Sequence, residues 1–210
     1  MYKKKSVFIT FEGIEGSGKS YQSKKLFNKI KEMRLPVIFT REPGGSEGAE
    51  KIRNLILNGK KKKFNNVTDT LLYLSARNEH YLKTLKPAIA NKQIIVCDRF
   101  IDSTIAYQVI GSGVDSKLVN FVHKKIFKKF KPDITFVLKL NINKALYRVN
   151  RRKNKNRYDK LSKKFYNKVQ KGFIKIANSN KKRYVLLDTT FDTKVVEKII
   201  LKKFLKFINK

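Results

Sequence analysis

The chain has 210 residues, 41% of them hydrophobic, which is enough to bury the core of one domain, so we expect a single domain over residues 1–210. No apolar run is long enough to cross a bilayer, and no signal-type apolar stretch follows the basic N-terminus. Cys97 is the single cysteine, which excludes an internal disulfide framework and favours a reducing cytoplasm. We therefore expect a cytoplasmic protein without a membrane partner.

The composition is strongly basic, because 50 Lys and Arg residues stand against 16 Asp and Glu residues and give a formal net charge of +34. Such a charge suits nucleic acid or an anionic surface. However, the basic residues are mostly lysines scattered over nearly every segment, and Asn, Ile, Phe and Tyr are also plentiful. This pattern favours compositional drift towards A/T-rich codons over a selected surface. We expect no specific nucleic-acid partner.

The first motif along the chain is the run 13–20, G-I-E-G-S-G-K-S, which matches the phosphate-loop pattern G-x-x-x-x-G-K-[ST] at every fixed position. An apolar run at 7–11 predicts a strand before it, and the pattern at 21–33 predicts a helix after it. Backbone N–H groups of such a loop, together with the helix N-terminus, surround phosphate oxygens. The predicted ATP-binding residues are Gly13, Ile14, Glu15, Gly16, Ser17, Gly18, Lys19 and Ser20.

Strands and helices are predicted to alternate along the rest of the chain. Further strands are expected at 37–39, 94–97, 134–140 and 184–187, and helices at 46–57, 68–90, 101–110, 115–129, 142–149, 159–179 and 192–209. Residues 60–63 are expected to form a solvated lysine loop, and the apolar contacts of the helix at 68–90 are assigned to Leu71, Leu72, Leu74, Leu82 and Leu85. Alternation of this kind predicts an α/β fold, with a parallel sheet covered by helices on both faces.

Polar clusters follow the first three predicted strands. The phosphate loop follows the first, Arg41 and Glu42 follow the second, and Asp98 and Arg99 end the third. Parallel sheets bind ligands beyond the carboxyl ends of their strands, so we expect these clusters to converge. Arginine is scarce, at ten residues. Its presence at these strand ends suggests bidentate contacts with phosphates or bases.

Together these residues predict phosphoryl transfer. Lys19 would hold the donor phosphates, and Ser20 and Asp98 would position Mg²⁺, Asp98 through a water molecule. Arg41 and Arg99 would hold an acceptor phosphate. An acceptor that is already anionic needs no strong general base, and we expect the two histidines, His80 and His123, to be ordinary surface or packing residues.

The motifs resemble those of the thymidylate kinase family over nearly the whole chain. The resemblance is carried by 8–20 (F-I-T-F-E-G-I-E-G-S-G-K-S), 40–45 (T-R-E-P-G-G), 73–77 (Y-L-S-A-R), 98–108 (D-R-F-I-D-S-T-I-A-Y-Q), 132–138 (P-D-I-T-F-V-L) and a basic stretch ending in R-Y-D at 157–159. It implies a P-loop nucleoside monophosphate kinase fold with a five-stranded parallel sheet and a short lid at about 148–158. It also implies a homodimer that phosphorylates dTMP to dTDP with ATP and Mg²⁺ in dTTP biosynthesis.

The resemblance also implies a role for each residue of the dTMP site. Tyr73 would stack on thymine and Arg77 would hydrogen-bond a thymine carbonyl, while Tyr107 would crowd the position of a ribose 2′-hydroxyl. The other implied dTMP ligands are the base-pocket residues Thr104 and Gln108 and the phosphate ligands Arg41 and Arg99. Glu15 would face the acceptor sugar or its phosphate.

The predicted lid carries the arginines that the phosphate loop lacks. They are Arg148, Arg151, Arg152 and Arg157. The resemblance therefore points to the bacterial lid-arginine type, with Arg152 as the catalytic arginine and Arg157 as the second choice. The predicted catalytic set is Lys19, Arg152, Arg99 and Glu15.

Two alternatives stay open from the sequence. One is a kinase that acts on another small phosphorylated substrate. The other is a nucleic-acid-binding P-loop ATPase, which the charge suggests and which predicts salt-dependent binding to DNA or RNA. The second is the weaker, because no basic run is interleaved with aromatic residues on one binding element.

Overall fold

The computed structural model describes residues 5–58, 64–128, 130–190 and 192–209. The lysine run 60–63 lies outside the described residues. Five strands form one sheet: β1 (Val7–Glu12), β2 (Val37–Arg41), β3 (Ile94–Asp98), β4 (Ile134–Lys139) and β5 (Tyr184–Asp188). Their order is β2-β3-β1-β4-β5 and every pairing is parallel, as the alternating pattern predicts.

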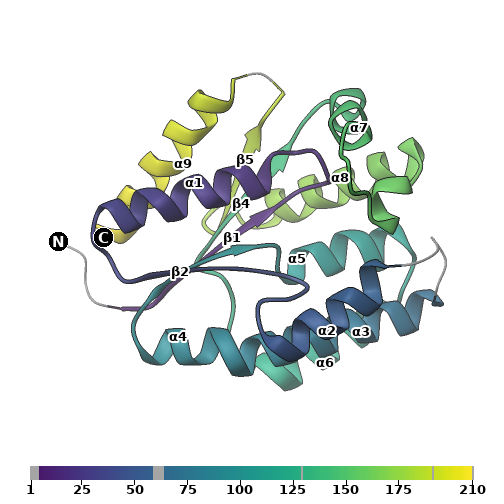
Figure 1. Ribbon diagram of the computed structural model, residues 1–210, viewed down its shortest axis with the longest axis horizontal. Coiled ribbons are helices and arrows are strands. Elements are labelled where there is room, and N and C mark those ends of the chain that lie inside the picture. Colours follow the sequence, from purple (N-terminus) through teal and green to yellow (C-terminus); the bar gives the residue numbers. More distant parts are fainter. Residues whose placement is uncertain (1–4, 59–63, 129, 191, 210) are drawn as a thin grey trace.

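Helices cover both faces of this sheet (Figure 1). On one face, α1 (Lys19–Glu32) and α9 (Thr193–Ile208) pack against the odd-numbered side chains of β1, such as Ile9 and Phe11. These side chains are buried because the strand alternates its residues between the faces, and both faces are covered.

The opposite face carries the longer run of helices. In chain order these are α2 (Glu47–Leu57), α3 (Asn66–His80), the π-helical turn η1 (Tyr81–Leu85), α4 (Lys86–Ala90), α5 (Ile101–Thr104), the π-helical segment η2 (Ile105–Gly111), α6 (Ser116–Phe127), α7 (Ile142–Asn150), the 3₁₀ turn η3 (Arg157–Lys160) and α8 (Lys163–Ser179). Their apolar side chains form two clusters, one around Phe8 and Phe100 and the other around Val137 and Phe173. None of the helices in the described part of the chain is both long and apolar enough to span a bilayer.

Two details of the predicted helices are wrong. The helix predicted at 159–179 begins only at Lys163, because Ser162 caps it by accepting a hydrogen bond from the Phe165 N–H, at 3.2 Å. In the helix predicted at 68–90, Leu71 and Leu82 are each 43% exposed and so lie outside the core. Cys97 is buried in the core and is not part of a disulfide.

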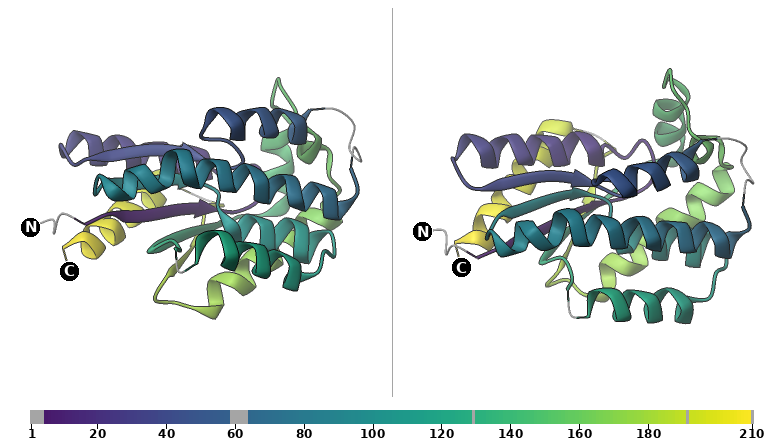
Figure 2. Two further views of the ribbon diagram at one scale, coloured as in Figure 1. Left: turned by 90° about the horizontal axis from the view of Figure 1, so that it is seen from below. Right: turned by 60° about the horizontal axis from the view of Figure 1, so that its bottom comes forward.

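The two ends of the sheet differ in what lies beyond them. The described N-terminal and C-terminal segments lie together at one end, and α7 with the segment that follows it lies at the other (Figures 1 and 2). In the strand register Phe11 of β1 pairs with Asp98 of β3, and Asp98 also pairs with Arg41 of β2. Residues that are far apart in sequence are thereby brought to one level at the carboxyl edge.

Candidate active site

The phosphate loop lies between the end of β1 and the start of α1. Its backbone needs glycine at Gly13 and Gly16, which have φ of 142° and 78°, in the region that favours glycine. A Cβ at Gly16 would also meet the carbonyl oxygen of Ala145 at 2.7 Å. Helix α1 begins at Lys19, directly after the loop, so its N-terminal N–H groups face the same space. This is the anion-binding geometry that the motif predicts.

A cavity of about 160 Å³ opens beside the loop, at the carboxyl edge of β1, β2 and β3. All seven predicted dTMP ligands line it: Arg41, Tyr73, Arg77, Arg99, Thr104, Tyr107 and Gln108. So do five residues predicted for catalysis, donor or metal binding: Glu15, Lys19, Ser20, Asp98 and Arg152. The three clusters that follow separate strands therefore converge, as the parallel sheet requires.

Lys19 provides the central cation of the cavity. Its side chain is buried, and its ammonium group lies 3.3 Å from the carbonyl oxygen of Ile14. Burial, together with the neighbouring Arg99, lowers the pKa of Lys19 to about 8. The group is therefore a cation at neutral pH but holds its proton less firmly than an exposed lysine.

Glu15 and Arg99 form an ion pair at the cavity wall, with 2.9 Å between Oε1 and Nη2. Burial alone would raise the pKa of Glu15, but Arg99 and Lys19 outweigh it and lower that pKa, so Glu15 is an anion. Its second oxygen accepts a hydrogen bond from the Tyr107 hydroxyl, and Arg99 lies over the Tyr107 ring at 5.2 Å. Ser103 Oγ accepts a further hydrogen bond from Arg99, at 2.8 Å. Arg99 is thus held in one orientation before any anion binds.

Ser20 and Asp98 present oxygen ligands next to each other. The Ser20 hydroxyl donates to one carboxylate oxygen of Asp98, and the other oxygen, Oδ1, is buried without a partner. A hydroxyl beside an unsatisfied carboxylate fits Mg²⁺, which prefers oxygen ligands and keeps several of its waters. Within the described residues there is no cluster of three or more His, Cys, Asp or Glu residues suited to a metal ion, so phosphate and water oxygens would have to complete the shell.

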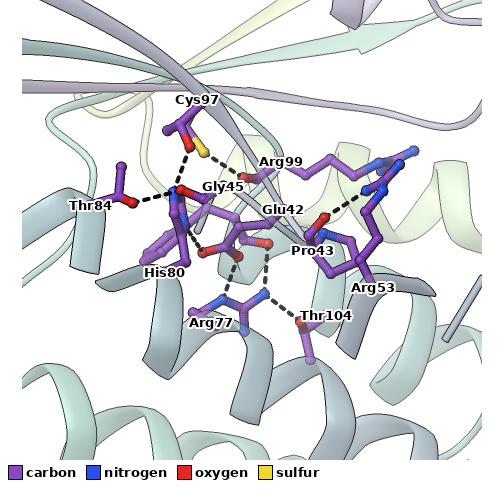
Figure 3. Close-up of polar contacts among 12 residues, drawn as sticks. Glu42, Pro43, Gly45, Arg53, Arg77, His80, Thr84, Cys97, Arg99 and Thr104 are labelled. Carbon is purple, nitrogen blue, oxygen red and sulfur yellow. Dashed lines mark hydrogen bonds and ion pairs between the residues drawn. The ribbon is translucent and has the colours of Figure 1, made fainter. Parts of the chain in front are cut away.

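Arg77 is fixed at the cavity by a buried network that also contains Glu42 and His80 (Figure 3). Its Nε donates to Glu42 at 2.6 Å and its Nη2 donates to the Thr104 hydroxyl at 2.8 Å. His80 Nδ1 lies 3.0 Å from the other Glu42 oxygen, and its Nε2 lies 2.7 Å from the Thr40 hydroxyl. The remaining Arg77 nitrogen, Nη1, is buried without a partner, which leaves two N–H donors for a ligand.

The lid arginines lie in four different environments. Arg152 lines the cavity and pairs with Asp159 at 2.8 Å. Arg148 donates to the carbonyl oxygen of Gly16 at 3.0 Å, and Arg151 lies over the Tyr147 ring. Arg157 is buried and pairs with Asp69 of α3 at 2.7 Å. Of the four, only Arg152 lines the cavity.

Comparison with known proteins identifies the family. The sequence profile described as "Thymidylate kinase" matches residues 11–200 of this chain. The chain belongs to the thymidylate kinase family. A thymidylate kinase from Wolbachia pipientis wMel is 49% identical over 173 residues, which are 81% of this chain and 85% of that protein. One from Sulfurihydrogenibium sp. (strain YO3AOP1) is 38% identical over 194 residues, 92% of this chain and 94% of that protein.

A solved structure from the thymidylate kinase family has the same fold. The crystal structure of thymidylate kinase from Ehrlichia chaffeensis matches this chain with a TM-score of 0.78 at 33% identity, and covers 95% of this chain and 99% of that one. The predicted P-loop kinase fold with a five-stranded parallel sheet is thereby confirmed.

Several residues that line this cavity were not assigned to the site by the sequence analysis, among them Arg53, Asn156 and Tyr158. Arg53 of α2 lines the cavity and donates to the carbonyl oxygen of Pro43 at 2.6 Å, and Tyr158 and Asn156 line it from the lid. The scarcity of arginine was a usable signal for Arg53. Asn156 and Tyr158 fall within the stretch predicted as a lid, but only the fold of that stretch shows that they reach the cavity.

The two histidines lie outside the cavity. His80 is buried behind Glu42. His123 packs against the Phe127 ring at 4.7 Å between ring centroids, and burial lowers its pKa to about 4. His123 is therefore a packing residue, as the sequence predicts, whereas His80 belongs to the hydrogen-bonded network of Glu42 and Arg77.

Proposed function

We propose that this protein transfers the γ-phosphoryl group of ATP to dTMP, giving ADP and dTDP, in the biosynthesis of dTTP. One observation carries the proposal: a single cavity joins the phosphate-loop lysine to a pocket with an aromatic wall and an arginine that has free N–H donors. Membership of the thymidylate kinase family supports it. A cytoplasmic location fits a chain whose single cysteine, Cys97, is buried and free.

The base of dTMP would bind between Tyr73 and Arg77. Tyr73 offers an aromatic face at the cavity, and the Nη1 of Arg77 offers donors to a thymine carbonyl oxygen. Because Glu42 and Thr104 already hold the rest of the guanidinium, these donors would be oriented before the base arrives. Gln108 would complete the base pocket, and Tyr107 would stand against the sugar.

The acceptor phosphate would bind where Arg41 and Arg99 face the cavity, with Arg53 beside them. Both partners of the Arg41–Glu50 pair are partly exposed, so Arg41 can exchange its carboxylate for a phosphate at small cost. Arg99 is already oriented by Glu15 and Ser103. The phosphate would then point towards Lys19, which is the direction of the donor.

In the transfer step, Lys19 would neutralise charge on the β- and γ-phosphates of ATP, and Arg152 would stabilise the transferring group from the lid. Glu15 would keep Arg99 and Tyr107 in place beside the acceptor. The acceptor oxygen is already anionic, so no side chain has to remove a proton from it. Ser20 and Asp98 would hold Mg²⁺, which supplies charge neutralisation between donor phosphates when bound.

A coupled assay of ATP consumption tests the proposal with a panel of nucleoside monophosphates. We expect rapid ADP formation with dTMP, weaker turnover of ribothymidine monophosphate, and little with AMP, CMP or GMP. Preference for another phosphorylated substrate, or ATPase activity that appears only with DNA or RNA, would contradict it.

The thymine contact is tested by Arg77→Lys, which keeps a positive charge beside buried Glu42 but removes Nη1. We expect KM for dTMP to rise about tenfold or more, since a buried carbonyl would lose its partner. KM for ATP should stay unchanged in the same steady-state measurements, and the melting temperature would report any loss of folding. An unchanged KM for dTMP would show that Arg77 does not bind the base.

We also propose that two copies of the chain form a dimer. Apolar side chains are exposed on α3, on η1, which continues α3, and on α6, which packs against α3: Val67, Leu71, Leu82 and Phe121 are 48%, 43%, 43% and 62% exposed. Exposed apolar groups gathered in this way mark an interaction surface. Sedimentation equilibrium should give twice the mass of the chain, and Leu71→Lys with Phe121→Lys should give the monomer. A monomeric wild-type protein would contradict the assignment.

A further inference from the structure

The lid is tied to α3 by an ion pair that none of the roles above uses. Nη2 of Arg157 lies 2.7 Å from Oδ2 of Asp69, and the two side chains are 3% and 15% exposed. Asp69 stands one helical turn before Tyr73 and two turns before Arg77, so the three residues share one face of α3. The lid is therefore fastened to the helix that presents the base-binding residues.

The turn that carries Arg157 also carries one residue that lines the cavity, Tyr158, and one that holds a cavity residue, Asp159. In η3, Asp159 accepts hydrogen bonds from the Asn156 N–H at 3.0 Å and from Arg152 at 2.8 Å. Tyr158 lines the cavity, and its hydroxyl accepts a 3.2 Å hydrogen bond from Arg157. One short turn thus positions Tyr158 directly and Arg152 through Asp159.

Tyr158 packs against two other tyrosines that line the pocket. Its ring meets Tyr73 edge to face, with 6.2 Å between ring centroids and 71° between ring planes, and it meets Tyr107 at 5.9 Å and 81°. These are favourable geometries for aromatic pairs. Three tyrosines from α3, η2 and the lid therefore surround the space proposed for the base and sugar.

The Asp69–Arg157 pair also has unused bonding capacity. Oδ1 of Asp69 and Nε of Arg157 are both buried without a partner. An ion pair that served stability alone would have hydrogen-bond partners for both atoms, because a buried polar atom without a partner costs folding free energy. An arginine and a carboxylate can form two parallel hydrogen bonds, so this pair has the atoms for a second bond that would tighten the contact as the pocket fills.

We propose that Asp69 and Arg157 are positioning residues that couple occupation of the acceptor pocket to the placement of Arg152. Through this pair, α3 holds η3 so that Tyr158 lies against the acceptor and Arg152 faces the transferring phosphoryl group. The proposal rests on the function proposed above. It gives Arg157 a role that differs from the catalytic one for which the sequence made it the second choice.

The test is a double-mutant cycle with Asp69→Asn, Arg157→Gln and both together, and steady-state kinetics for each substrate. We expect each single change to lower kcat/KM for dTMP by about 10- to 100-fold through misplacement of Tyr158 and Arg152, with KM for ATP within about twofold of wild type. The double variant should be no worse than the worse single variant, because both changes remove one contact. Glu47→Gln, which breaks the exposed Glu47–Lys51 pair on α2, is the matched control and should behave as wild type.

Several results would overturn the proposal. One is a kcat/KM for dTMP within about twofold of wild type in Asp69→Asn, and another is additive losses in the double variant. A pair that is only structural would lower the melting temperature and leave both KM values unchanged. If Asp69→Asn does not fold, Arg157→Lys keeps the charge and is judged by the same kinetic criteria. A wild-type protein without activity on dTMP would refute the proposed function, whereas wild-type activity with unaffected variants would refute only this inference.

Discussion

Replacing Lys19 with alanine should lower kcat by about 100-fold or more, because in the proposed mechanism the variant would lose the cation that neutralises charge on the donor phosphates. Lys19 is buried among Glu15, Asp98 and Arg99, so no other residue of the loop can substitute for it. Single-turnover measurements with ATP and dTMP at saturating concentrations would give the rate. A kcat within about threefold of wild type would remove Lys19 from the reaction.

The pH profile provides a control for this role. Burial lowers the pKa of Lys19 to about 8, and only the protonated form attracts phosphate. Because kcat/KM reports the free enzyme, kcat/KM for ATP should be near its maximum at pH 7, should fall to about half at pH 8 and should decrease further at higher pH. Bound phosphates stabilise the protonated form of Lys19, so kcat, which reports the enzyme with its substrates bound, should fall only at a higher pH than kcat/KM does. The activity that remains in Lys19→Ala should not show this fall in kcat/KM for ATP at high pH.

The second large effect is expected at Arg152. Arg152→Ala should lower kcat by about two orders of magnitude, since the lid would no longer bring a positive charge to the transferring group. The binding of dTMP, measured separately by calorimetry, should weaken far less. Arg151→Ala is the matched control, because Arg151 lies over Tyr147 and does not line the cavity. A normal kcat in Arg152→Ala would move the catalytic charge to another residue.

Much of the fold was predictable because its strands are short apolar runs between helical patterns. The strands predicted at 7–11 and 37–39 stop short of the observed ends at Glu12 and Arg41, where the sheet continues into polar residues. A hydrophobic pattern cannot detect such ends, because the last residues of these strands are polar. Leu71 and Leu82 show the converse error, since apolar residues at helical spacing say nothing about which of them face solvent.

The start of α8 was missed for a local reason. Residues 159–179 read as one amphipathic helix, but Asn156 and Asp159 form a capping box around η3, and Ser162 caps a separate helix. The spacing of Asn156 and Asp159 was visible in the sequence. The role of this spacing could not be predicted, because only the fold shows that this turn holds Arg152 and Tyr158 at the cavity.

Site residues were predictable where a motif fixed them and were missed where tertiary contacts brought them in. Lys19 and Ser20 belong to a loop whose pattern implies its function, and the strand ends predicted the convergence of Arg41, Asp98 and Arg99. Asp69 and Arg157 are 88 residues apart and meet only when the lid packs on α3. No pattern along the chain reports such a contact.

The central claim is that one cavity presents dTMP to ATP, with the base at Tyr73 and Arg77 and the phosphate directed at Lys19. A crystal structure with dTMP and a non-hydrolysable ATP analogue tests it most directly. We predict thymine against Tyr73, with its phosphate between Arg41 and Arg99 and the γ-phosphate at Lys19. A thymine ring bound away from α3, or an acceptor phosphate out of reach of both arginines, would contradict it.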